Sequence, residues 1–181
     1  MTEQHDELVA SLEADLRALS AAEADLERDA EVAERTRAER TAITLRDRLR
    51  GAHGPVEIST YGGGTHAGLV VETGAGWVLL EHVPVGQRQP TAEHLVMLDA
   101  VLTVRGLGRI ALGGRGVLAD RSTGSVLRAW CRDRSQVSAL LIDGSVVPGM
   151  ASATFLDHLE LSTGGGGTLA VPLAALAVLS R

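Results

Sequence analysis

The sequence predicts an α+β protein, with a long N-terminal helix or helical hairpin followed by two tandem five-stranded β-barrels. Three observations predict this class. Residues 1–50 contain no glycine or proline and are rich in good helix formers. Beyond Gly51 the chain changes to short apolar runs separated by glycine clusters, which is typical of strands and turns. This second part also repeats itself at an offset of 81 residues. We expect boundaries at 1–40 for the helical segment, 41–106 and 125–181 for the barrels, and 107–124 for a linker.

The first segment carries an acidic heptad pattern. Residues 1–34 hold eleven acids against two arginines, a net charge of −9, and residues 35–50 reverse to +4. Acids first and bases last suit the dipole of a helix. Two interpretations stay open: a coiled coil that binds itself or a partner, which we favour, and a helix that packs on the chain's own barrels. In the first case, association would depend on Val9, Leu12, Leu16, Leu19 and Leu26.

The two copies of the repeat predict the same elements in the same order. The offset aligns Val56 with Val137, Gly68 with Gly149 and Leu80 with Leu161. A glycine inside a strand permits a sharp bend, and five short bent strands make a small barrel. The expected elements of the first copy are a capping helix over 41–50, strands over 56–61, through Gly68 and over 77–82, and two strands joined at Asp99-Ala100. Their counterparts are a helix over 125–132, strands over 137–142, through Gly149 and over 158–162, and a corner at Ala174-Ala175.

This pattern of an apolar strand, a glycine turn and a strand with a central glycine resembles the Sm-like family, which includes bacterial Hfq. The resemblance covers residues 41–104 and 125–179 and implies bent barrels that associate through strand edges; a pair of SH3-like barrels is the alternative. The positions with which the family binds RNA do not carry over. The loops after the second strands read TGAG (73–76) and TFLD (154–157), and neither Asp99-Ala100 nor Ala174-Ala175 can hold a phosphate.

The sequence predicts no catalytic, cofactor or metal site. The six histidines lack the spacing of metal ligands, and Cys131, the single cysteine, is expected to be a small buried thiol. The glycine clusters at 62–64 and 164–167 do not continue into a phosphate-binding sequence, and hairpin turns explain them better. We therefore expect that the protein is not an enzyme.

One segment is strongly basic. Residues 105–134 carry seven arginines against two aspartates, a net charge of +5. These arginines could hold a nucleic-acid backbone, or they could pair with the acidic N-terminal segment, which we favour because that segment would compete with nucleic acid. The candidate residues are Arg105, Arg109, Arg115, Arg121, Arg128, Arg132 and Arg134.

Together these observations favour a non-enzymatic assembly or adaptor protein that associates with itself or with a protein partner. The alternative is an RNA-binding or other nucleic-acid-binding regulatory protein of the Hfq-like type. No apolar run is long enough to span a membrane, and the N-terminal residues lack the features of a signal peptide, so we expect a cytoplasmic protein. All seventeen basic residues are arginine, which indicates a GC-rich genome such as that of an actinobacterium.

Overall fold

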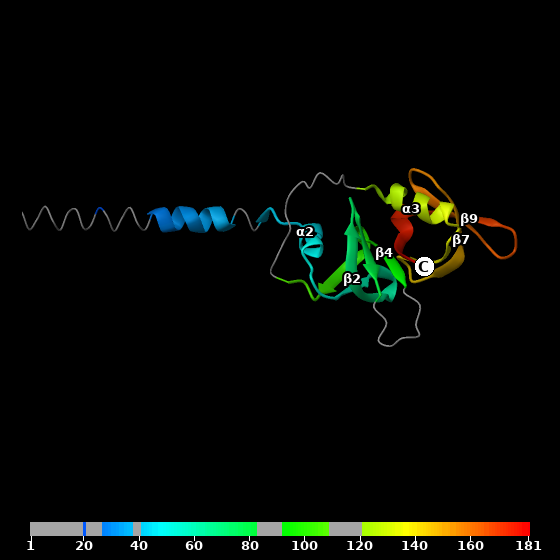
Figure 1. Cartoon of the computed structure of the whole chain (residues 1–181), viewed down its shortest axis with the longest axis horizontal. Helices are drawn as coiled ribbons and strands as arrows, with labels where there is room; N and C mark the ends of the chain where they lie inside the picture. Colours follow the sequence, from blue (N-terminus) through cyan, green and yellow to red (C-terminus); the bar gives the residue numbers. More distant parts are fainter. Residues whose placement is uncertain (1–19, 21–26, 38–40, 83–91, 109–120) are drawn as a thin grey trace, which may run out of the picture. The chain divides into compact units, whose positions relative to one another are not determined.

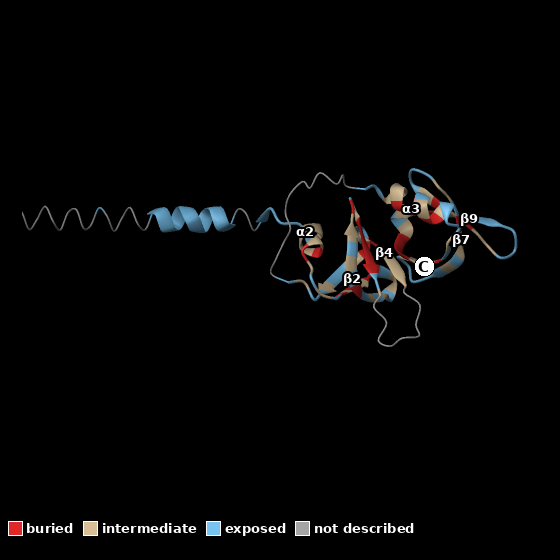
Figure 2. Ribbon diagram, in the orientation of Figure 1, coloured by how far each residue is buried: buried red, intermediate tan, exposed pale blue. Residues whose placement is uncertain are grey.

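The chain divides into two compact units in the computed structural model, Met1–Ile43 and Thr44–Arg181. The structure describes residues 20, 27–37, 41–82, 92–108 and 121–181. In the first unit, residues 27–37 form a helix whose residues are all exposed (Figure 2). Within this helix Arg37 pairs with Glu34 at 2.7 Å, a contact between exposed side chains that adds little stability.

The predicted long N-terminal helix or helical hairpin is wrong for the part of the chain that the structure describes. The described N-terminal helix covers 27–37, and the backbone is not helical at Ile43 and Thr44. Thr44 has the extended dihedral angles φ −87° and ψ 163°. Two neighbouring β-branched residues disfavour a continuing helix because they lose χ1 freedom in it, and Thr44 instead begins the next one.

Helix α2, Leu45–Arg50, begins at a capping box. The backbone N–H of Asp47 donates to the Thr44 hydroxyl at 3.2 Å, and the Thr44 N–H donates to the Asp47 carboxylate at 3.0 Å. These reciprocal bonds satisfy two N–H groups that a helix start otherwise leaves free. The Thr44 hydroxyl also donates to the Asp47 carboxylate at 2.6 Å, and this bond, together with the one from the Thr44 N–H, holds the pKa of Asp47 below its usual value. The helix buries Leu49 completely, which anchors it to the sheet.

The second unit is built on one ten-stranded antiparallel sheet (Figure 1). Its strand order is β5-β1-β2-β3-β4-β10-β6-β7-β8-β9. The first five strands are β1 (Val56–Thr60), β2 (Thr65–Thr73), β3 (Trp77–Glu81), β4 (Glu93–Met97) and β5 (Val101–Arg105). The others are β6 (Gln136–Leu141), β7 (Val146–Thr154), β8 (His158–Ser162), β9 (Thr168–Pro172) and β10 (Leu176–Ser180).

The predicted pair of five-stranded barrels is also wrong, because the described strands form a single open sheet. A three-residue 3₁₀ turn, η2 (Leu98–Ala100), turns the chain between β4 and β5, so that β5 pairs with β1 instead of folding back on β4. The free side of β4 then pairs with β10, where Val96 lies opposite Val178 and Leu95 opposite Leu179. This pairing joins strands that we had assigned to separate barrels, and β5 and β9 are left as the two edges.

The central strands are buried on both faces. Alternate residues of a strand point to opposite sides of a sheet, and here each side meets a different apolar core. In β3, Trp77 and Leu79 belong to the core that includes Leu127 of α3 (Thr123–Arg132), whereas Val78 and Leu80 belong to the core that includes Leu49 of α2. Strands β4 and β10 also contribute residues to both cores, so three strands connect the two cores.

Helix α3 covers the second core with one apolar face. Val126, Leu127 and Trp130 are buried on this face, while Arg128 is exposed. The helix lies against β7. Just before it, the carbonyl of Arg121 accepts a hydrogen bond of 2.9 Å from the indole N–H of the fully buried Trp77. This bond satisfies a polar group that would otherwise be costly to bury.

Two turns approach each other closely where the two five-stranded sets meet. Gly62, in the turn η1 (Tyr61–Gly63), has φ +83°, and a Cβ added to it would collide with the carbonyl oxygen of Leu141 and approach Gly144 at 3.3 Å. Gly63 has a similar φ of +78° but open space around it. The two neighbouring glycines therefore share a left-handed backbone conformation, which would strain any other residue, and differ in the space around them.

We predict that Gly62→Ala destabilises the protein by about 2–4 kcal/mol, because strain and a backbone clash add up. The matched change Gly63→Ala should cost only about 1 kcal/mol, since it introduces strain alone. Urea unfolding followed by circular dichroism measures both values. Equal losses for the two variants would contradict the close approach of these turns.

Candidate functional site

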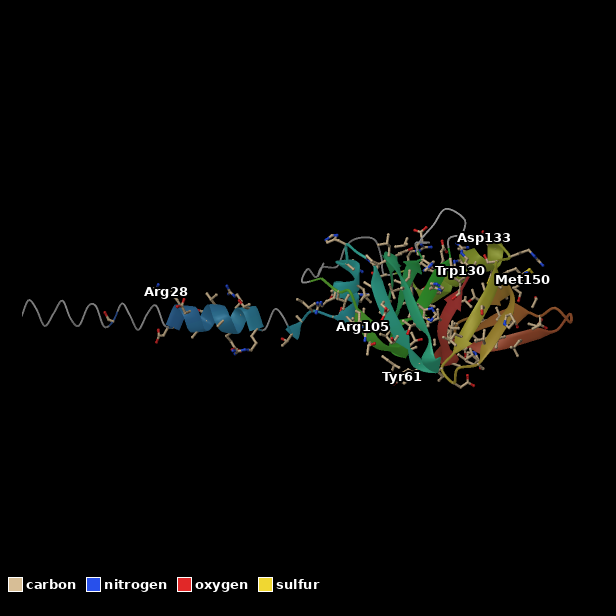
Figure 3. All side chains as sticks on the ribbon, turned by 90° about the horizontal axis from the view of Figure 1, so that it is seen from below. Arg28, Tyr61, Arg105, Trp130, Asp133 and Met150 are labelled. Atoms are coloured by element: carbon tan, nitrogen blue, oxygen red, sulfur yellow. The ribbon has the colours of Figure 1, made fainter. Side chains whose placement is uncertain are left out.

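The seam between β4 and β10 joins the two five-stranded sets of the described sheet. Beyond the paired strands, the backbone N–H groups of Glu93 and Arg181 each donate to the other's carbonyl at 3.0 Å. The Arg181 side chain binds the Glu93 carboxylate at 2.7 Å, approaches Asp133 at 3.5 Å and lies over Trp130 at 4.7 Å from the ring centre. Trp130 and Asp133 belong to the end of α3 (Figure 3). One arginine therefore ties β4, β10 and the end of α3 together.

The two edges of the sheet expose unpaired backbone groups. The backbone N–H of Leu173 donates to the backbone carbonyl of Asp157. Because bonded and non-bonded positions alternate along an antiparallel pair, the backbone groups of Pro172, Ala170 and Thr168 point away from β8. Proline lacks an N–H, and its presence at an outward position is typical of an edge strand. Apolar side chains are exposed on both edges: Leu169 of β9 is 42% exposed and Leu102 of β5 is 52% exposed.

Of the five candidate arginines in the described chain, two form ion pairs with acidic residues and three do not. Arg105 binds Glu57 across β1 and β5 at 3.3 Å, and Arg121 binds both carboxylate oxygens of Glu72, at 3.0 and 3.2 Å. Arg128, Arg132 and Arg134 are exposed and make no ion pair within residues 121–181 or elsewhere in the described chain. Arg109 and Arg115 lie outside the described residues, as do the predicted association positions Val9, Leu12, Leu16, Leu19 and Leu26.

Arg128 and Arg132 line one cleft between α3 and β7. The cleft has a volume of about 320 Å³, and its other lining residues are Cys131, Ser152, Ala153 and Thr154. Burial raises the pKa of the Cys131 thiol, which is therefore neutral near pH 7. The Ser152 hydroxyl donates to the carbonyl of Glu160 at 2.9 Å, whereas the hydroxyl of Thr154 is shielded from solvent and has no hydrogen-bond partner.

A second cavity, of about 420 Å³, lies where the corners of the sheet meet. Its wall includes Met97, Asp99 and Ala100 near η2, and Leu173, Ala174 and Leu176 near the equivalent turn η3 (Leu173–Ala175), with Tyr61 and Ile142 also contributing. The wall is mostly apolar, with one carboxylate and one phenol. The corners that the sequence singled out thus lie together, and they present no cation among the lining residues.

Sequence spacing did not reveal a histidine pair beside the seam. The rings of His66 in β2 and His94 in β4 lie 5.0 Å apart. His94 shares a hydrogen bond of 2.7 Å with Ser180 of β10, whereas Nε2 of His66 is buried without a partner. The described residues contain no group of three His, Cys, Asp or Glu side chains that could hold a metal ion.

Burial lowers the pKa of His66 and, together with the nearby charges of His66 and His82, that of His94. A histidine whose folded pKa is depressed contributes stability that is present above its unfolded pKa and is lost as the pH falls. We predict that the free energy of unfolding decreases as the pH is lowered from about 7 to about 5. Chemical denaturation at each pH measures it.

The double variant His66→Gln and His94→Gln should flatten this pH profile, while His53→Gln, which changes an exposed histidine, should leave it unchanged. Three carboxylates, those of Asp47, Asp143 and Asp157, also have lowered pKa values. Their titration changes the free energy of unfolding only below about pH 4, which lies outside this window. A wild-type profile that is flat between pH 7 and 5 would refute the assignment.

The glycine-rich segments form turns where the structure describes them. Gly62 and Gly63 lie in η1, and the N–H of Gly166 donates to Thr163 at 3.0 Å in the turn before β9. At the Asp143-Gly144 turn, the Asp143 carboxylate accepts hydrogen bonds from the N–H and hydroxyl of Ser145, which lowers its pKa. The interpretation of the two glycine clusters as turns is confirmed.

Comparisons with known proteins assign no family. No protein-family model, no curated protein and no solved structure matches this chain. Among the helices of the described chain, none is both long and apolar enough to cross a membrane. The function must therefore be argued from the sheet, its edges and the clusters described above.

Proposed function

We propose that this protein is a non-enzymatic assembly protein whose copies join edge to edge, β9 of one copy pairing with β5 of the next. The observation that carries the proposal is the β4–β10 seam, where the chain makes such a joint within itself. The two edges of the described sheet are the counterparts of the two strands in that seam.

The pairing registers support this equivalence. Register shifts occur between Val70 and Glu72 where β2 meets β3, and between Ala151 and Ala153 where β7 meets β8. Both positions differ by 81 residues, the offset of the sequence repeat. The shift between Ser59 and Thr60 opposite β5 likewise has its counterpart between Leu176 and Val178 opposite β6. Two sets of strands that share irregularities have similar curvature and similar edges.

The equivalence also gives a register for the proposed contact. In the seam, Val178 faces Val96, Leu179 faces Leu95 and Ser180 faces His94. The last two strands of the first set, β4 and β5, correspond to β9 and β10 at an offset of 75 residues. Applied to the seam, this offset places Thr103 opposite Val171, Val104 opposite Ala170 and Arg105 opposite Leu169. The contact would cover Leu169 and Leu102, which are exposed at the edges. Added backbone hydrogen bonds and buried apolar area are the usual basis of edge pairing.

The predicted acidic heptads are a second proposed means of association. The five positions that would carry it lie outside the described residues, and the described helix over 27–37 is fully exposed. An exposed, highly charged helix is available to a partner helix. The nucleic-acid alternative has less support, because Arg105 and Arg121 are already paired with acids.

Leu169→Lys tests the edge contact in the full-length chain. A lysine at an edge strand opposes pairing, so the mass measured by light scattering should fall relative to the wild type. Leu156→Lys is the matched control, since Leu156 is 97% exposed but lies in the β7–β8 loop. An unchanged mass for Leu169→Lys, or a wild-type protein that stays monomeric at high concentration, would disprove the edge contact.

The register itself is testable by cross-linking. Arg105→Cys combined with Leu169→Cys should form disulfide-linked multimers on oxidation, because side chains directly opposite in neighbouring strands lie at disulfide distance. The control combination, Arg105→Cys with Leu156→Cys, should not form disulfide-linked multimers, because Leu156 lies in the β7–β8 loop and not in the edge strand β9. Both are made with Cys131→Ser, which removes the single native thiol. Multimers from both combinations would indicate unspecific collision rather than the proposed register.

A further inference from the structure

We propose that the cleft between α3 and β7 is a binding site for a phosphate group, held by Arg128 and Arg132. The inference is independent of edge-to-edge assembly. It begins from Arg128 and Arg132, which line one cleft and make no ion pair with a described residue. The term "α3 cleft" is used below for the space lined by Arg128, Cys131, Arg132, Ser152, Ala153 and Thr154.

The placement of the two arginines follows from helix geometry. Residues four apart lie on the same face of a helix, so Arg128 and Arg132 stand one turn apart along α3, above β7. Like charges at this spacing repel each other. A group with two negative charges removes that repulsion, whereas a single carboxylate is already satisfied by one bidentate arginine. The pair therefore suits a phosphate better than a carboxylate.

None of the residues that line the α3 cleft is acidic. Asp133, next to Arg132 in sequence, is approached by Arg181 at 3.5 Å. Cys131 carries no charge near neutral pH because burial raises the pKa of its thiol. A negatively charged ligand in the α3 cleft would therefore meet two cations and a neutral wall.

Thr154 gives the cleft an unused hydrogen-bond donor. Its hydroxyl is buried and has no partner in the described structure, whereas the neighbouring Ser152 hydroxyl is already bonded to Glu160. Buried hydroxyl groups normally have a partner. A phosphate oxygen would provide an acceptor for this group, in addition to the guanidinium groups, once the side chains of the cleft adjust around it.

Arginines near a helix C-terminus also interact favourably with the helix dipole, so a purely structural role is the competing explanation. It predicts a loss of stability and no ligand. The two explanations are separable because both side chains are exposed. Their replacement by glutamine removes charge without disturbing the core.

The test titrates full-length, ¹⁵N-labelled protein with inorganic phosphate at constant ionic strength and follows amide resonances by NMR. We expect saturable shifts for residues of the α3 cleft. Arg128→Gln with Arg132→Gln should weaken binding about tenfold or more. Arg134→Gln is the matched control: it removes the same charge from an exposed arginine that does not line the cleft, and it should bind as the wild type does.

Two additional ligands identify the source of the phosphate. If a single-stranded oligouridylate competes for the same resonances, the phosphate belongs to a nucleic-acid backbone; if it does not, the ligand is a small phosphate compound. Either result supports the site. Three results would overturn it: no saturable shift with phosphate, an equal loss in Arg134→Gln, or a polyglutamate peptide that binds the cleft more tightly than phosphate. The last would assign the cleft to an acidic peptide.

Discussion

The pairing of β4 with β10 is the contact on which the rest of the second unit depends. Leu95, Val96, Val178 and Leu179 are all completely buried, and each strand directs alternate residues to different cores. Removing the contact would expose apolar surface on both sides of the sheet. Burial of a leucine or valine contributes about 1.5–3 kcal/mol, so four such residues account for a large share of the stability of a domain this size.

This contact also joins strands that lie far apart in the sequence. Strand β4 and strand β10 are separated by more than half of the second unit, and each completes the core of the other set. Contacts between residues distant in sequence slow folding because loop closure comes before the gain in burial. The local elements, α2 with its capping box and the hairpins β2–β3 and β6–β7, make short-range contacts. They can form early, whereas the seam closes the structure.

The sequence predicted the local elements well because their signals are local. Alternating apolar residues located the strands, glycines located the turns, and the end of the second helix was placed correctly at Arg132. Thr44 and Asp47 form a capping box that could have been found in the sequence, and it would have moved the expected start of the helix over 41–50 to Leu45.

The arrangement of the strands could not be predicted in the same way. The run Trp77–Leu80 is apolar at every position, which is consistent with a strand buried on both faces. The predicted barrel would instead have buried this strand against a single core. Strand β4 pairs with a strand far along the chain, since Val96 lies opposite Val178, 82 positions later. No local pattern in the sequence encodes that pairing. Likewise, the spacing of His66 and His94 carries no signal, because only the fold brings their rings together.

Because three strands contribute to two cores at once, the second unit does not divide into two independent halves, even though its strand order repeats. A fragment cut between the two sets would carry Trp77, Leu79 and Leu95 on a naked apolar face, beside the unpaired edge of β4. Such a surface is prone to aggregation. Any evolutionary or engineered separation of the halves would therefore require that this face be made polar first.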